Sequence, residues 1–235
     1  MTVSPWRGGS LAVAHVDAHG LAGVLFTGSA HTGAFIHRKF AGRPEVMLAL
    51  ELGGNNALIV WPPVEAKAAA NLIAHSAYAT TGQRCSCARR LIVPDTAEGA
   101  ALIARVAQLC GEIVVGPATQ TPEPFMGPLN SATSAERAVA FEARLSGRGG
   151  KSIVPLKRDG AFVHPGIVDV TGLTPPDEEL FGPVLQVYRA QDFDHALDLA
   201  NATRFGLTGG MVSDDPALWG RVKNEMRVGV LNWNR

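Results

Sequence analysis

Short apolar runs alternate with stretches of helical periodicity along most of the chain, and this alternation constrains the fold more than any other feature. Residues 23–27 (GVLFT) read as a buried strand, and residues 57–61 (ALIVW) and 90–94 (RLIVP) as further strands. Residues 64–81 and 192–201 space their apolar side chains as in helices with one buried face. Repeated strand–helix alternation predicts an α/β fold with a largely parallel sheet.

Capping residues mark several helix starts. We expect Asp95 to cap a helix that runs to about Leu109, with Glu98 completing a capping box three residues later. Asp215 and Pro216 form an N-cap and first-turn pair for the last helix. The other expected elements are strands at 46–54 and 228–233, several short strands within 153–189, and helices at 30–40 and 131–145.

The composition is that of an ordinary globular protein. Of the 235 residues, 46% are hydrophobic and 18% are charged, and 21 Lys and Arg balance 21 Asp and Glu. A neutral chain without a basic patch favours neither a nucleic-acid nor a membrane-surface partner. No apolar run approaches the roughly 20 residues that cross a bilayer, and the first 20 residues lack the apolar core of a signal peptide. Three cysteines are an odd, low count that fits a reducing compartment, so we expect a cytoplasmic protein.

Two of the three cysteines lie within residues 80–93, TTGQRCSCARRLIV. A disulfide between Cys85 and Cys87 would close a strained ring, and a structural zinc site usually needs four ligands, so both are disfavoured and no metal is expected. Cys110, near the end of an apolar helix, is predicted to be a small buried hydrophobe.

Three arginines flank Cys85 in the sequence, namely Arg84, Arg89 and Arg90. Positive charge near a thiol increases the fraction of reactive thiolate. Two interpretations of Cys85 remain open at this point, a nucleophile and a thiol that only packs.

A nucleophile that forms an acyl intermediate needs a base to release it. Glu51 lies among apolar residues in LALELGG, where desolvation would raise the pKa of its carboxyl toward the range of a base. An ordinary glutamate at a strand end is an equal alternative. Gly28 and Ser29 lie between a strand and a helix start, where backbone N–H groups bind phosphate. That segment lacks the three spaced glycines of the usual dinucleotide fingerprint.

Taken together, four segments resemble motifs of the aldehyde dehydrogenase superfamily. They are FTGSAHTG (26–33), LELGGNN (50–56), GQRC (82–85) and EELFGPV (178–184), in the order of the family. The resemblance implies an α/β catalytic domain with an open, mostly parallel sheet at residues 54–235, lacking its C-terminal end. It also implies that residues 1–53 are the C-terminal remnant of a Rossmann-like NAD-binding domain, and that the full-length family forms homo-oligomers.

The resemblance implies a role for each matching residue. Cys85 would be the nucleophile and Glu51 the base that activates the deacylating water. Glu179 would bind the nicotinamide-side ribose of NAD, with Phe181 beside the ring, although a solvated loop acid and a core phenylalanine are the alternatives. The turn at the NAD diphosphate would comprise Gly28, Ser29, Ala30, His31, Thr32 and Gly33.

Finer matches resemble the branch of the family that oxidises succinylglutamate semialdehyde. They are IHRKFAGRPE (36–45), the Asn55–Asn56 pair and GQRCSCARRL (82–91). That small-molecule aldehyde carries carboxylates, and Arg84 beside the nucleophile would form a bidentate pair with one of them. An arginine that tunes the thiol, or one that is merely solvated, is an equal alternative.

Other functions remain open. The chain could act on another semialdehyde, or it could be an inactive truncated remnant or an interaction module. A thiol hydrolase would need a histidine paired with the nucleophile, and His75 lies ten residues before Cys85.

Overall fold

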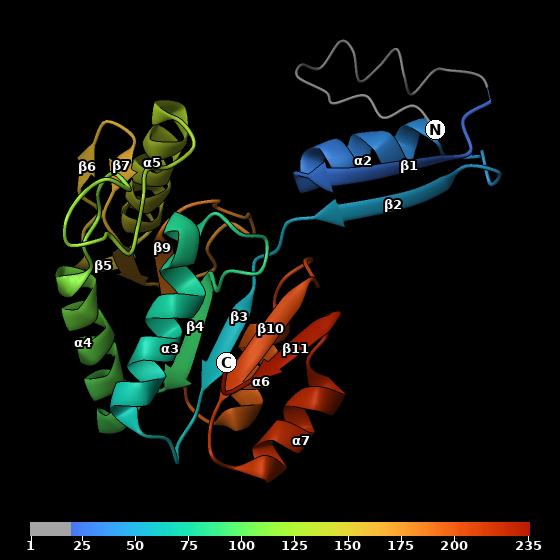
Figure 1. The fold of residues 1–235 in the computed structure, drawn as a ribbon. Helices are drawn as coiled ribbons and strands as arrows, with labels where there is room; N and C mark the ends of the chain where they lie inside the picture. Colours follow the sequence, from blue (N-terminus) through green and yellow to red (C-terminus); the bar gives the residue numbers. More distant parts are fainter. Residues whose placement is uncertain (1–19) are drawn as a thin grey trace. The chain divides into compact units, whose positions relative to one another are not determined.

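The computed structural model describes residues 20–235, which form two compact units (Figure 1). The first unit ends at Gly53, and the second is Gly54–Arg235. The expectation about a signal peptide concerns the first 20 residues, of which residues 1–19 lie outside the described residues. Within residues 20–235, no helix is both long enough and apolar enough to span a bilayer.

In the first unit, β1 (Gly23–Gly28) pairs in parallel with β2 (Met47–Leu52), and α2 (Ala30–Lys39) connects the two strands. Ile36 and Phe40 of the helix region form a small core with partly buried strand residues such as Phe26. The strand predicted at 23–27 is confirmed, but its predicted burial is wrong, because Leu25 is 74% exposed on the other face of the sheet.

The second unit is built on a seven-stranded sheet with the order β11-β10-β3-β4-β9-β8-β5. Every neighbouring pair is parallel except β5 with β8, so the predicted α/β fold with a mostly parallel sheet is confirmed. The strands are β3 (Ala57–Val60), β4 (Arg90–Pro94), β5 (Lys151–Val154), β8 (Gly166–Asp169), β9 (Val184–Ala190), β10 (Thr208–Val212) and β11 (Val230–Trp233). A separate short pair comprises β6 (Arg158–Asp159) and β7 (Phe162–Val163).

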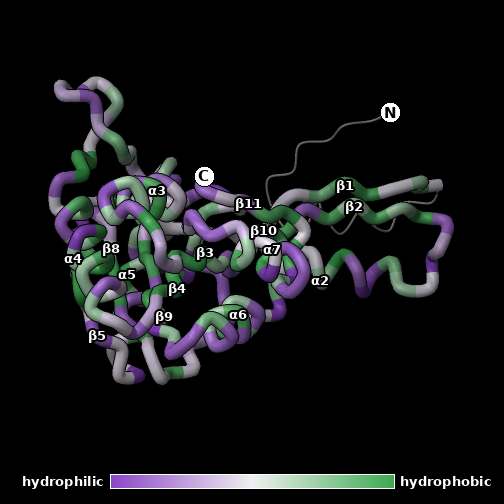
Figure 2. The backbone as a smooth tube through the Cα atoms, turned by 90° about the horizontal axis from the view of Figure 1, so that it is seen from below, coloured by the Kyte–Doolittle hydropathy of each residue, from purple (hydrophilic) through white to green (hydrophobic). Residues whose placement is uncertain are grey.

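Helices cover both faces of this sheet and bury two hydrophobic clusters against it. On one face lie α3 (Ala66–Tyr78) and α4 (Ala97–Glu112); on the other lie α5 (Ala132–Gly147), α6 (Phe193–Asn201) and α7 (Pro216–Glu225). Figure 2 shows the central strands β3 and β4 as mostly hydrophobic segments of the tube. Strands that are buried on both faces need apolar side chains throughout, which explains their continuous apolar sequences.

Two helix boundaries differ from the sequence expectation. The cap of α4 is Thr96, whose hydroxyl accepts from the Gly99 N–H at 3.3 Å, and not Asp95. The Asp95 N–H donates to the Ala190 carbonyl and so extends the pairing of β4 with β9. The helix expected over 64–81 is shorter, because α3 ends at Tyr78. In contrast, Asp215 caps α7 as predicted.

Candidate active site

The amino ends of four adjacent parallel strands meet at one edge of the sheet, and the candidate site of the second unit lies there. Asn55 and Asn56 precede β3, Cys85 precedes β4, Glu179 precedes β9, and Thr203 precedes β10. Neighbouring parallel strands begin at the same edge, so the topology brings these distant segments together.

Cys85 is the exposed thiol of the three cysteines, whereas Cys87 and Cys110 are buried. Burial raises the pKa of the Cys110 thiol to about 11, so that this residue stays neutral, and the prediction that it is a small buried hydrophobe is confirmed. Cys87 donates weakly to the Ala79 carbonyl at 3.7 Å. In contrast to these two buried thiols, Cys85 is accessible to solvent, as a nucleophile requires.

A strained turn leads from α3 to Cys85. The 3₁₀ turn Ala79–Gly82 contains three consecutive residues with positive φ: Thr80 at 52°, Thr81 at 59° and Gly82 at 69°. Threonine rarely adopts this conformation, and such strain persists where surrounding contacts fix it. The Thr81 hydroxyl donates to the Gly127 carbonyl at 2.9 Å. At Gly82 a Cβ atom would overlap the Gly182 carbonyl, so the position requires glycine.

Asn56 fixes the loop of Cys85 through hydrogen bonds to its backbone. Its buried side chain donates through Nδ2 to the carbonyls of Cys85 at 2.7 Å and Cys87 at 2.9 Å. Its Oδ1 accepts from the Thr208 N–H at 3.4 Å, on the neighbouring strand. Sequence reasoning used Asn56 only as part of a family motif. A polar residue directly before a fully apolar strand was the available signal for a structural hydrogen-bonding role.

Arg89 contacts the same loop from another direction. Its side chain is only 2% exposed and donates to the carbonyls of Gly82 at 2.6 Å and Arg84 at 2.9 Å. A longer contact of 3.5 Å reaches the Gly182 carbonyl, and Nη2 lies 3.6 Å from Oε1 of Glu179. The loop carrying Cys85 is thus fixed by two buried side chains.

The segment around Glu179 lies beside this loop. The Glu179 side chain is 14% exposed, so it is not a solvated loop acid. Burial raises the pKa of its carboxyl, while Arg89 and the backbone N–H of Gly54 act in the opposite direction. Phe181 is 45% exposed, which contradicts the alternative of a core phenylalanine, and its ring centroid lies 5.6 Å from the Arg89 guanidinium carbon.

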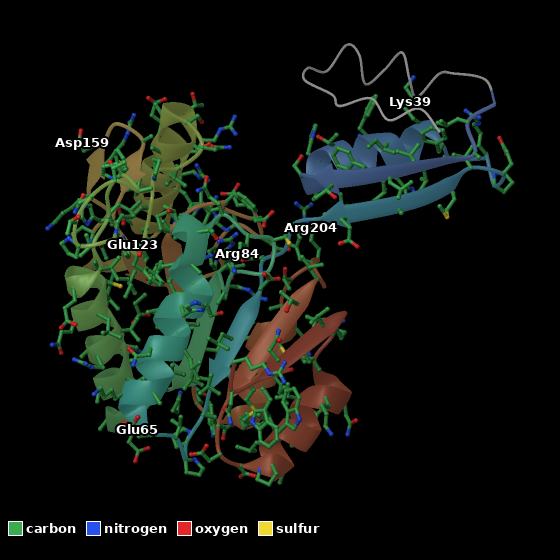
Figure 3. The ribbon with its side chains drawn as sticks, in the orientation of Figure 1. Lys39, Glu65, Arg84, Glu123, Asp159 and Arg204 are labelled. Atoms are coloured by element: carbon green, nitrogen blue, oxygen red, sulfur yellow. The ribbon has the colours of Figure 1, made fainter. Side chains whose placement is uncertain are left out.

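The other two arginines near Cys85 in sequence differ from each other. Arg84 is exposed, and its Nε donates to the Thr80 hydroxyl at 2.8 Å. Figure 3 shows Arg84 near the C-terminal end of α3, with Glu65 at the opposite end. Arg90 was expected to supply positive charge near the Cys85 thiol, but its guanidinium binds elsewhere. Its guanidinium donates to the carbonyls of Leu199 and Ala200 in the last turn of α6, where a cation stabilises the helix end.

Asp177 supports the segment before β9. It accepts hydrogen bonds from Asn55 Nδ2 at 3.0 Å, from the Thr203 hydroxyl at 2.6 Å and from the Arg204 N–H at 2.8 Å. Although burial acts to raise the pKa of this carboxyl, these hydrogen bonds outweigh burial and lower it. The ionised Asp177 therefore links the starts of β3 and β10 to the segment that carries Glu179.

The remaining predicted site residues lie in the first unit. Ser29 caps α2 by accepting from the Thr32 N–H at 3.3 Å, so the start of this helix is formed by Gly28–Gly33 as expected. Glu51 is exposed near the end of β2, and its expected desolvation is wrong within this unit. Strand alternation explains the error, because Leu50 and Leu52 point to the opposite face.

His75, the candidate partner for a thiol hydrolase, lies on α3. Its ring packs against Phe125, with ring centroids 6.1 Å apart. This contact gives His75 a packing role and assigns it no part in the cluster around Cys85.

Comparisons with known proteins give a consistent result. A family model described as the aldehyde dehydrogenase family matches residues 4–235. The chain is 55% identical over 216 residues to an N-succinylglutamate 5-semialdehyde dehydrogenase of Caulobacter sp. strain K31. This alignment covers 91% of this chain and 44% of that protein. It is 46% identical over 220 residues to the protein of the same name from Hahella chejuensis, covering 92% of this chain and 45% of that protein. The chain thus spans less than half the length of these relatives.

Solved structures also resemble this chain. A 1-pyrroline-5-carboxylate dehydrogenase from Thermus with bound NAD superimposes with a TM-score of 0.85 at 32% identity, covering 96% of this chain and 45% of that chain. A betaine aldehyde dehydrogenase from Staphylococcus aureus in complex with NAD⁺ gives a TM-score of 0.82 at 27% identity, covering 91% of this chain and 43% of that chain.

Proposed function

Because the chain belongs to the aldehyde dehydrogenase family, we propose that it carries the thiol chemistry of an NAD-dependent aldehyde oxidation, with Cys85 as the nucleophile. The observation that carries this proposal is the exposed Cys85 on a loop whose carbonyls are held by buried Asn56 and Arg89. An accessible thiol on a fixed backbone meets the positional demand of covalent catalysis.

The reaction would proceed through a covalent bond at Cys85. Its thiolate adds to the aldehyde carbon, and nearby backbone N–H groups stabilise the resulting oxyanion. Loss of hydride leaves a thioester on the sulfur, and a water molecule activated by Glu51 hydrolyses the thioester to the carboxylic acid. NAD, when bound, accepts the hydride.

The residues proposed to hold NAD suit that cofactor. Glu179 offers a buried Oε1 that accepts no hydrogen bond, which is the kind of acceptor that a ribose hydroxyl needs. Backbone N–H groups in the turn Gly28–Gly33, at the start of α2, suit a diphosphate. Phe181 supplies an exposed aromatic surface in the same segment as Glu179. We assign the first unit to the cofactor-binding domain and the second to the catalytic domain.

The substrate we propose is N-succinylglutamate 5-semialdehyde, which the names of the relatives indicate. Arg84 is exposed and adjacent to Cys85, so its guanidinium could pair with a carboxylate of such an aldehyde. This pairing would be rejected if the Arg84→Ala variant oxidised anionic and neutral aldehydes in the same ratio as the wild type. The alternative of another semialdehyde is tested separately, by comparing the oxidation rates of succinylated and non-succinylated semialdehydes. We further propose a cytoplasmic location, to which three free thiols are suited, and a homo-oligomeric state for the longer family members.

The test compares two conservative cysteine variants in an assay of NADH formation with the semialdehyde. Cys85→Ser should abolish the reaction, because an alcohol is a far weaker nucleophile than a thiolate. Cys87→Ser is the matched control, since Cys87 is buried two residues away and should leave the reaction largely intact. Persistent NADH formation in Cys85→Ser would reject the assignment, and no reaction with the wild-type chain would reject turnover by these 235 residues.

A further inference from the structure

Arg89 touches two segments that are far apart in the sequence and adjacent in the fold. We propose that Arg89 is a positioning residue that fixes the Cys85 loop and the Glu179–Phe181 segment relative to each other through its one buried guanidinium. The inference rests on the proposed function for the roles of Cys85 and Glu179, whereas the contacts themselves do not depend on it.

The contacts divide cleanly between the two segments. On the Cys85 side, the guanidinium donates to the carbonyls of Gly82 at 2.6 Å and Arg84 at 2.9 Å. Both residues lie just before Cys85 in the chain. On the other side, it lies 3.5 Å from the Gly182 carbonyl, 3.6 Å from Oε1 of Glu179 and against the Phe181 ring. One planar group therefore fixes both segments.

These contacts require arginine in particular. The guanidinium presents several N–H donors in a rigid fork, which suits carbonyls that approach from different directions, whereas a lysine ammonium acts as a point charge. Lysine at position 89 would keep the charge and lose the fork. The geometry therefore separates two functions of the same side chain, namely fixing the backbone and supplying charge.

The charge of Arg89 has its own consequence for the site. Burial lowers the pKa of this guanidinium, and attraction to Cys87, Glu179 and Cys85 opposes that effect. A buried cation without a compensating negative charge is costly. The Glu179 carboxylate and the Arg89 guanidinium therefore stabilise each other. The distance of 3.6 Å leaves Oε1 of Glu179 without a hydrogen bond and so free to accept one from a ligand.

Arg90 provides a matched control in the next position. It is also a buried arginine that donates to carbonyls, but its partners are Asn55, Leu199 and Ala200. Substitution of either arginine should destabilise the fold, because each leaves buried carbonyls unpaired. Only substitution of Arg89 should affect the two site segments directly.

The experiment compares Arg89→Lys and Arg89→Met with Arg90→Lys and Arg90→Met in the whole chain, without aldehyde or NAD. The first measurement is amide hydrogen exchange by mass spectrometry in residues 82–88, 178–184 and 199–202. The second is the rate of alkylation by iodoacetamide, assigned to the Cys85 peptide. Thermal unfolding of each variant provides a measure of general destabilisation.

We expect both Arg89 variants to increase exchange about tenfold in residues 82–88 and 178–184 together, which corresponds to the loss of one charge-assisted hydrogen bond. Alkylation of Cys85 should slow in Arg89→Met and recover in Arg89→Lys, because a nearby cation favours the reactive thiolate. The Arg90 variants should instead increase exchange in residues 199–202 and leave the alkylation rate near that of the wild type.

Three results would overturn the inference. They are increased exchange in only one of the two site segments, alkylation that responds equally to substitution of Arg89 and Arg90, and unchanged exchange in Arg89→Lys. If Arg89→Met does not fold, the exchange pattern of Arg89→Lys decides the question alone. Because no substrate is present, failure here leaves the proposed oxidation standing, and failure of the NADH assay leaves the role of Arg89 standing.

Discussion

At the scale of single residues, the side-chain amide of Asn56 and the guanidinium of Arg89 both fix the backbone of the Cys85 loop. Both are buried polar groups that donate to carbonyls of the loop. A buried carbonyl that loses its donor keeps the cost of desolvation. The candidate nucleophile is thus held through its backbone, which leaves its sulfur exposed.

Asn56→Ala and Asn56→Asp test this backbone support. Alanine removes both donations to Cys85 and Cys87, and we expect the free energy of unfolding to fall by about 2–3 kcal/mol. Aspartate should cost more, because an ionised carboxylate only accepts hydrogen bonds and would face two carbonyl oxygens. Urea unfolding monitored by circular dichroism measures the difference. Equal stability of Asn56→Asp and wild type would contradict this account.

The buried carboxyl of Glu179 should make stability depend on pH. Burial raises its pKa above the ordinary value of 4.5, so the folded state binds its proton more tightly than the unfolded state does. Its contribution to stability is therefore present below the unfolded-state pKa and is lost as the pH rises through the folded-state pKa.

Glu179→Gln should remove this dependence. We expect the free energy of unfolding of the wild type, relative to the variant, to decrease as the pH rises from 4.5 toward neutrality. Urea titrations at several pH values measure the difference. Glu178→Gln is the control, because Glu178 is the adjacent carboxylate, is partly exposed and pairs with Arg144. A wild-type-to-variant difference that grows with pH would show that the sign is wrong.

At the scale of elements, the sequence predicted the strands and helices well because their signals are local. The apolar runs at 57–61 and 90–94 became β3 and β4, and Asp215 caps α7 as expected. The capping of α4 was misassigned because Asp95 and Thr96 are both good caps. Only the pairing of the Asp95 N–H with Ala190 decides between them, and that contact is not local.

Substitutions at the start of α4 can verify this assignment. Thr96→Ala should lower the free energy of unfolding by about 1 kcal/mol, because it leaves the Gly99 N–H without its acceptor. Asp95→Ala should have a smaller effect, since the strand pairing of Asp95 uses its backbone N–H and not its side chain. Thermal unfolding of both variants gives the comparison. A larger loss in Asp95→Ala would restore Asp95 as the cap.

At the scale of the whole molecule, the candidate site depends on sheet order, which periodicity does not encode. The family motifs indicated Cys85 and Glu179, but the segments that carry them are connected through Arg89. The sequence indicated only the charge of Arg89 and not its partners. Likewise, nothing local distinguishes Arg90, which supports the end of α6, from Arg89, which supports the loop. The direction of each side chain depends on strand alternation and on neighbours supplied by β9 and β10.

The same sheet order predicts that the second unit folds without the first. All members of the two large buried clusters lie within residues 54–235. The described part of the first unit has a two-stranded sheet, one helix and three buried core residues, and a two-stranded sheet is marginally stable alone. A fragment of residues 54–235 should therefore unfold cooperatively in urea, whereas a fragment of residues 20–53 should lack stable structure by circular dichroism. A fragment 54–235 without a cooperative transition would show that its sheet and two clusters are insufficient for folding.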